Sequence, residues 1–196
     1  MIKKLIDIHK NFRTDKGTRH NYIEVYDSLF SQIHGSVKNI LEIGTLFGGS
    51  LKLWNEYFEH ATIYGVEDFS QKEGFGQLVD KELIIKDLSS YERIKLKVFD
   101  SSNGELVKSN LGHVKFDVII DDASHSLLNQ VANINNFFDL LSDTGIYIIE
   151  DIQSINDSEA LSAFIGSKTN KKCQIVELNT QYISDDRLLI LDKRNV

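Results

Sequence analysis

The stretch VKNILEIGTLFGGS, residues 37–50, decides the fold because it joins an apolar run to a glycine-rich turn and the start of a helical pattern. Residues 37–43 have the composition of a buried β-strand. Residues 50–58 then place apolar side chains at helical spacing, which predicts a helix. A strand, a glycine turn and a helix in this order begin a βαβ unit of a parallel sheet.

The same alternation continues along the chain. Further strands are predicted over 61–66, 94–99, 116–120 and 146–149, and further helices over 2–11, 20–33, 127–141 and 158–166. Asp143-Thr144-Gly145 is predicted to form the turn before the strand 146–149. Residues 83–85 fit either a strand or part of a helix, and Gly74 and Gly76 indicate a loop insertion.

Two final strands, 174–178 and 188–191, have a short connection and so predict an antiparallel hairpin at one sheet edge. The predicted fold class is α/β: a Rossmann-like, doubly wound, mostly parallel sheet preceded by N-terminal helices. Because no linker or repeat interrupts the pattern, residues 1–196 are expected to form one domain. Residues 1–35 would be an N-terminal helical or lid segment and residues 36–196 the Rossmann-like core.

The overall composition argues against several classes of binding partner. A formal net charge of −7 argues against a nucleic-acid backbone or an anionic membrane as the main partner. Cys173 is the only cysteine, which excludes an internal disulfide and a cysteine-based zinc site. The first residues lack the apolar core of a signal peptide, so a cytoplasmic location is expected. The aromatic face of residues 22–30 fits either the core or a homo-oligomer contact, which leaves the oligomeric state open.

Two acidic clusters follow neighbouring apolar runs. DDASH, residues 121–125, follows the strand 116–120, and ED, residues 150–151, follows the strand 146–149. If these strands are parallel neighbours, both clusters emerge at the same carboxyl edge of the sheet, where open α/β sheets bind ligands. So many carboxylates together are costly unless a cation or proton relieves them. The pair of clusters therefore predicts a hard divalent metal with a catalytic base beside it.

Three strand ends carry groups suited to a nucleoside. The glycines of residues 44–49 allow a close backbone approach to a ligand, although a tight strand–helix turn alone would also explain them. Their spacing differs from the dinucleotide pattern, which disfavours a nicotinamide dehydrogenase. Glu67, preferred over Asp68, ends the second strand and could accept hydrogen bonds from ribose hydroxyls. Asp100 or Ser101 ends the third strand and could reach an adenine.

These motifs together resemble a known family. EIGT, residues 42–45, with GGS, residues 48–50, is similar to the first motif of class I S-adenosylmethionine-dependent methyltransferases that act on small molecules. The acidic clusters resemble more narrowly the Mg²⁺-dependent macrolide-sugar and rhamnosyl O-methyltransferases and the cephalosporin hydroxylase group. The resemblance implies S-adenosylmethionine, Mg²⁺, and methyl transfer to a hydroxyl of a sugar, nucleotide-sugar or glycosylated metabolite. In contrast to the larger macrolide enzymes, this chain is expected to have no separate N-terminal domain, which leaves the substrate and the oligomeric state open.

The resemblance also implies residue roles. The metal ligands would be Asp122, Glu150 and Asp151, and the catalytic pair would be Asp122 with His125 as general base. Three carboxylates would leave about three positions on the metal, enough for two vicinal hydroxyls. The residues implied for cofactor binding are Glu42, Gly44, Thr45, Gly48, Ser50, Glu67, Asp100, Ser101 and Asp121, the last facing either the cofactor or the backbone.

The leading segment allows two interpretations. TDK, residues 14–16, followed by His20 and Tyr22, resembles the group's segment near the active site and could close as a lid. An ordinary polar turn before an aromatic helix face packed on the sheet explains the same residues.

Other functions stay open on the sequence. A catechol-type O-methyltransferase would use the same metal chemistry on a planar diol. A metal-dependent hydrolase would use the acidic clusters without a nucleoside and would not bind S-adenosylmethionine. A non-catalytic scaffold would be expected to have lost ligand or base residues, which this sequence retains.

Overall fold

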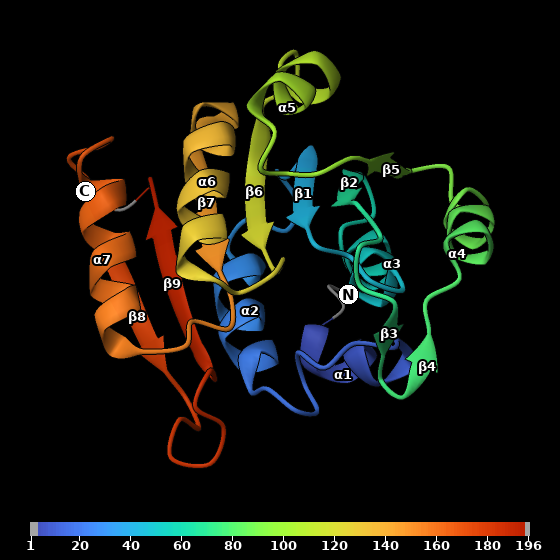
Figure 1. Cartoon of the computed structure of the whole chain (residues 1–196), viewed down its shortest axis with the longest axis horizontal. Coiled ribbons are helices and arrows are strands. Elements are labelled where there is room, and N and C mark those ends of the chain that lie inside the picture. The colour runs from blue at the N-terminus through green and yellow to red at the C-terminus, as the bar shows by residue number, and fades with distance from the viewer. Residues whose placement is uncertain (1–3, 195–196) are drawn as a thin grey trace. The chain divides into compact units, whose positions relative to one another are not determined.

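Strands and helices alternate along the chain as predicted (Figure 1). The computed structural model describes residues 4–194. Its contacts divide the chain into two units, one ending at Phe99 and the other beginning at Asp100. The expectation of a single domain stays a prediction.

The first unit contains three parallel strands in the order β5-β2-β1. They are β1 (Asn39–Ile43), β2 (Thr62–Glu67) and β5 (Ile94–Val98). The helices are α1 (Leu5–Ile8), η1 (His9–Asn11), α2 (Tyr22–Ser31), α3 (Gly49–Tyr57) and α4 (Lys81–Leu88). A small antiparallel hairpin, β3 (Glu73–Gly74) with β4 (Gln77–Leu78), precedes α4. Residues 2 and 3 of the predicted helix 2–11 lie outside the described residues.

Aromatic side chains hold α2 against α3. The Trp54 ring lies 5.4 Å from the Tyr26 ring and 5.7 Å from the Phe30 ring, and Phe30 lies 5.3 Å from Phe58. All of these rings are buried, as is Tyr22. Edge-on aromatic pairs add to the gain from burial. The aromatic face of residues 22–30 therefore packs in the core.

The second unit contains four strands in the order β6-β7-β9-β8. They are β6 (Phe116–Asp121), β7 (Leu141–Ile149), β8 (Cys173–Glu177) and β9 (Arg187–Asp192). β6 and β7 are parallel, whereas β9 is antiparallel to both β7 and β8, which confirms the predicted C-terminal hairpin. The helices are α5 (Gly104–Leu111), α6 (Leu127–Phe137), η2 (Phe138–Leu140) and α7 (Ile155–Gly166). Helices α6 and α7 lie side by side, and α7 packs on β8 and β9 (Figure 1).

The structure settles one open prediction and differs from the sequence prediction at two other elements. Residues 83–85 belong to the helix α4, whose start is capped by the Asp80 side chain. Helix α5 was not predicted, because only Val107 and Leu111 give it a buried face. The predicted turn 143–145 lies within β7, where the register shifts and the Gly145 carbonyl accepts a hydrogen bond from the Lys193 N–H at 3.0 Å.

Among residues 4–194, none of the helices combines the length and apolar character that crossing a bilayer requires.

Candidate functional site

The glycine turn after β1, residues 44–49, has the backbone shape that its glycines allow. Gly44 and Gly48 have φ of 81° and 72°, in the left-handed region that other residues seldom adopt. A Cβ on Gly48 would lie 2.7 Å from the Leu88 side chain, so a larger residue would clash as well. No side chain caps the start of α3, and backbone N–H groups there suit an anionic or polar ligand.

Glu67 holds this turn in place. Its Oε2 accepts hydrogen bonds from the N–H groups of Thr45 at 2.9 Å and Leu46 at 2.8 Å, and its Oε1 accepts one from Phe69 N–H at 2.9 Å. Leu46 and Phe69 have φ of 45° and 57°, which costs free energy that these bonds help to offset. The carboxylate therefore braces the turn, and its contact with a ribose stays a prediction.

Glu42 lies in a buried polar group of the first unit. Its Oε2 accepts a hydrogen bond from Trp54 Nε1 at 2.8 Å, and its Oε1 lies 3.4 Å from Lys16 Nζ. Lys16, His20 and Tyr22 are all buried, with His20 and Tyr22 stacked 4.9 Å apart. The leading segment was interpreted either as a lid or as a polar turn before a packed helix face. These buried contacts agree with the packed arrangement. A cofactor contact for Glu42 stays a prediction.

The other residues predicted to bind the cofactor include Thr45, Ser50, Asp100 and Ser101. Thr45 and Ser50 are buried, and Thr45 Oγ1 has no hydrogen-bond partner among the described residues. Asp100 Oδ1 accepts a hydrogen bond from Ser102 N–H at 2.8 Å, and the Ser101 carbonyl accepts one from Asn136 Nδ2 at 2.9 Å. These hydrogen bonds shape the turn before α5. The contact of Asp100 or Ser101 with an adenine stays a prediction.

The two acidic clusters meet as predicted within the second unit. Asp121 ends β6 opposite Ile149 of the parallel strand β7, and the Glu150 N–H donates to the Asp121 carbonyl at 2.9 Å. Asp122, His125 and Asp151 each bring one ligand atom into a group whose atoms lie within 4.8 Å of one another. His125 Nε2 lies 3.7 Å from Asp151 Oδ2. This cluster could hold a metal ion.

Two members of the cluster have a strained backbone. His125 has φ of 57° and Asp151 has φ of 53°, both in the left-handed region. Each such residue costs about 1–3 kcal/mol, and such strain concentrates at functional sites. His125 Nδ1 is also buried with no hydrogen-bond partner among the described residues.

Glu150 lies beside the cluster but outside the group of three. Its side chain is buried, and its carbonyl accepts a hydrogen bond from Gln130 Nε2 at 3.2 Å. The structure thus brings together Asp122 and Asp151 of the predicted ligands, with His125. Glu150 as a ligand stays a prediction.

No family model matches the chain. Among curated proteins, it is 26% identical over 151 residues to 8-demethyl-8-alpha-L-rhamnosyl tetracenomycin-C 2'-O-methyltransferase of Streptomyces olivaceus, covering 72% of this chain and 35% of the relative. It is 28% identical over 159 residues to demethylmacrocin O-methyltransferase of Streptomyces fradiae, covering 76% and 36%. The aligned part is about a third of the length of each of these relatives.

Solved structures agree over nearly the whole chain. MycE methyltransferase from the mycinamycin biosynthetic pathway, in complex with Mg and SAH, matches with a TM-score of 0.72 at 19% identity, covering 98% of this chain and 55% of that one. SAH-bound methyltransferase PaMTH1 of Podospora anserina matches with a TM-score of 0.60 at 16% identity, covering 96% and 86%.

The chain has the class I methyltransferase fold. This confirms the fold predicted from the sequence, including the antiparallel strands at the C-terminal end.

In this class I methyltransferase fold, α6 supplies two buried residues that sequence reasoning missed. Asn133 Nδ2 donates to Asp121 Oδ1 at 2.9 Å, and Gln130 donates to the Glu150 carbonyl. The helix thereby contacts the ends of both β6 and β7. Polar residues at positions i and i+3, next to the buried Ile134 and Phe137, were the available signal.

Asp121 is buried and is not a member of the group of three. Burial raises the pKa of its carboxyl to about 7, the charge of Asp122 adds to the rise, and the Asn133 hydrogen bond opposes it. Burial, together with Asp121, raises the pKa of the Tyr147 hydroxyl well above its usual value. Cofactor binding by Asp121 stays a prediction.

Replacing Asn133 by Ala is expected to lower the free energy of unfolding by about 1–3 kcal/mol, because the buried Asp121 carboxyl loses one of its hydrogen-bond donors. Urea denaturation followed by circular dichroism measures this. Asn135→Ala is the matched control: Asn135 is exposed on the same helix and should change stability by less than about 0.5 kcal/mol. Equal losses in the two variants would show that the Asn133 contact has no special weight.

Proposed function

We propose that this chain is an S-adenosylmethionine- and Mg²⁺-dependent O-methyltransferase that acts on a hydroxyl of a sugar or glycosylated small molecule. The observation that carries the proposal is the cluster of Asp122, His125 and Asp151 at the carboxyl ends of two parallel strands. The curated relatives, named as O-methyltransferases of tetracenomycin and macrolide glycosides, support the same reaction. Mycinamicin VI 2''-O-methyltransferase of Micromonospora griseorubida, 24% identical, is one of them.

The donor set of the cluster fits a hard divalent cation. Two carboxylates lie within reach of one point, and Mg²⁺ prefers oxygen ligands and usually keeps positions for water or substrate. We assign Asp122 and Asp151 to the metal, with Glu150 as a third carboxylate. When bound, such an ion would lower the pKa of a hydroxyl and orient it, together with a vicinal hydroxyl.

His125 would serve as the general base. Its side chain is about one-third exposed, so a substrate can approach it, while Asp151 Oδ2 lies 3.7 Å from its Nε2. A carboxylate at that distance would stabilise the imidazolium formed when His125 accepts the proton of the acceptor hydroxyl. The deprotonated oxygen would then form its new bond to carbon.

The methyl donor is assigned to the glycine turn, Glu67, and the residues that follow the third strand. When bound at these residues, S-adenosylmethionine would supply the methyl group, and the bond from its carbon to sulfur would break as the bond to oxygen forms. The uncapped N–H groups at the start of α3 and the buried Thr45 hydroxyl without a partner among residues 4–194 fit a polar ligand. The proposed contacts are Glu42, Gly44, Thr45, Gly48, Ser50, Glu67, Asp100, Ser101 and Asp121.

Two measurements together test this function. Isothermal titration calorimetry with S-adenosylhomocysteine is expected to show one site per chain, and radiolabelled S-adenosylmethionine is expected to label a rhamnosylated or macrolide-sugar acceptor in the presence of Mg²⁺. A chain that binds no S-adenosylhomocysteine, yet hydrolyses esters with a divalent metal, would instead be the metal-dependent hydrolase.

A further inference from the structure

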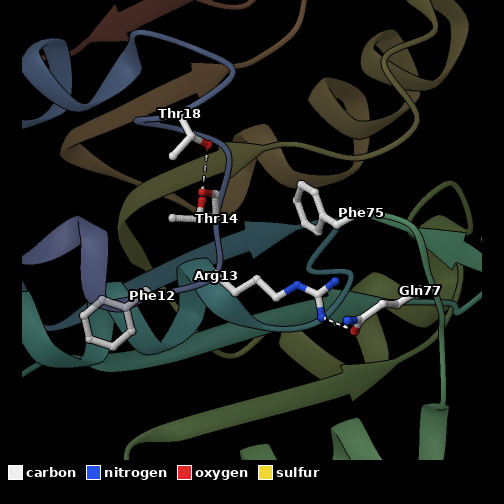
Figure 2. A pocket seen from close by; sticks show the side chains of 6 residues that line it. All are labelled: Phe12, Arg13, Thr14, Thr18, Phe75 and Gln77. Carbon is white, nitrogen blue, oxygen red and sulfur yellow. Dashed lines mark hydrogen bonds between the residues drawn. The ribbon is translucent and has the colours of Figure 1, made fainter.

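A cavity of about 530 Å³ lies in the first unit, between the leading segment and the β3–β4 hairpin (Figure 2). Its lining residues are Phe12, Arg13, Thr14, Thr18, Phe75 and Gln77. Arg13 extends across the middle of this view toward Phe75 and Gln77 (Figure 2). Aromatic, hydroxyl and guanidinium groups therefore line one open pocket, whose Arg13, Phe75 and Gln77 side chains are exposed, and the proposed function leaves it unassigned.

The guanidinium of Arg13 is exposed and lies against two aromatic rings. Its central carbon lies 4.1 Å from the centre of the Phe47 ring and 5.3 Å from that of Phe75. Its Nη1 donates to Gln77 Oε1 at 2.7 Å. The two ring centres are 6.1 Å apart, so the guanidinium lies over Phe47 and beside Phe75 rather than between the rings. These contacts favour one orientation of the planar group before a ligand arrives, which lowers the entropy cost of binding.

Most of the hydrogen-bonding capacity of Arg13 is left for a ligand. A guanidinium carries several N–H donors in a planar fork, and within residues 4–194 Gln77 is its one hydrogen-bond partner. Such a fork matches the paired oxygens of a carboxylate or phosphate.

The backbone of Arg13 is tied to the glycine turn. A Cβ on Gly49 would lie 1.7 Å from the Arg13 carbonyl oxygen, so the leading segment crosses the start of α3 in direct contact. Phe47, which stacks on the guanidinium, belongs to the same turn. The cavity therefore borders the turn to which the methyl donor is assigned.

We propose that Arg13 is the cation of an anion-binding subsite that takes a carboxylate or phosphate group of a bound reactant. The identity of that reactant rests on the proposed function. One source is the amino-acid carboxylate of S-adenosylmethionine; the other is the diphosphate of a nucleotide-linked sugar acceptor.

The test compares ligands that differ in the anionic group. S-adenosylhomocysteine and 5'-methylthioadenosine share the adenosine and the thioether, but only the former carries the carboxylate. Inorganic pyrophosphate, in EDTA, represents the phosphate source. Calorimetry is run on the wild type, Arg13→Gln and Arg13→Lys. The control is Arg19→Gln, which removes the same charge from the same segment outside the cavity lining.

If the carboxylate occupies the subsite, Arg13→Gln lowers the affinity for S-adenosylhomocysteine about tenfold, a loss of about 1.4 kcal/mol in binding free energy. The affinity for 5'-methylthioadenosine is then unchanged. If a phosphate occupies it, Arg13→Gln weakens pyrophosphate about tenfold and leaves S-adenosylhomocysteine unchanged. Arg13→Lys keeps the charge without the fork, so it should fall between wild type and Arg13→Gln and guards against misfolding as the cause.

The proposal is overturned if Arg13→Gln binds both anions as the wild type does, if Arg19→Gln weakens them equally, or if the wild type binds neither anion. Wild-type protein that binds pyrophosphate through Arg13 but does not bind S-adenosylhomocysteine would contradict the proposed function while supporting the subsite.

Discussion

Complete removal of divalent metal with EDTA is expected to lower methyl transfer by about 10³-fold or more, and added Mg²⁺ is expected to restore it. The reason lies in the grouping of Asp122, His125 and Asp151, whose ligand atoms lie within 4.8 Å of one another. Without a cation, these carboxylates would repel an alkoxide rather than stabilise it. The rate is measured with labelled S-adenosylmethionine before and after passage over a chelating resin.

Ligand variants locate the metal independently of the rate. Asp122→Asn and Asp151→Asn are expected to weaken Mn²⁺ binding at least tenfold in electron paramagnetic resonance titrations, since each loses one charged ligand. Glu150→Gln tests the third carboxylate in the same titration. Asp143→Asn, near the start of β7 and so at the opposite end of the strand from Glu150 and Asp151, is the control. Undiminished methyl transfer after full metal removal would refute the metal role.

Replacing His125 is expected to lower kcat by about 10²-fold or more, because the acceptor hydroxyl loses its base. His125→Asn is the sharper variant: asparagine tolerates the left-handed φ of 57° at this position but cannot accept the proton. His125→Ala gives a second measurement, and His113→Ala, at an exposed histidine of the same unit, is the control.

Metal affinity separates the two roles that His125 could have. As a general base, it can be replaced with Mn²⁺ affinity nearly unchanged and kcat lowered. As a metal ligand, its loss would weaken Mn²⁺ binding and activity together. A near-wild-type kcat in both His125 variants would refute the assignment as base.

The sequence predicted the parallel strands well because each carries a strong local signal. The apolar runs of β1, β2, β5 and β6 begin or end within about two residues of the predicted bounds. Helix α5 was missed because Val107 and Leu111 alone are too few for a recognisable apolar stripe; only the Asn103 cap marked its start. The irregular start of β7 could not be predicted, because it depends on a backbone hydrogen bond from Lys193, far along the chain.

The candidate site was predictable where it depended on strand ends. Parallel strands bring their carboxyl ends to one edge, so Asp122 and Asp151 could be paired from the sequence. The bonds that position the site could not be found in this way. Asn133 reaches Asp121, and Glu67 reaches the backbone of residues 45, 46 and 69, through side-chain directions that only the packed structure fixes.

The buried Lys16–Glu42 pair sets a practical limit on how the protein can be shortened. Glu42 lies next to the last residue of β1, and its side chain is wholly buried, yet a cationic partner comes from the segment ahead of α2. Deleting that segment would remove Lys16 and leave the buried Glu42 carboxylate with its Trp54 hydrogen bond but without this cation, at a cost of about 3–5 kcal/mol. A recombinant fragment trimmed to the strand-and-helix core would therefore fold poorly, and the safe starting point for any shortened version lies before Lys16.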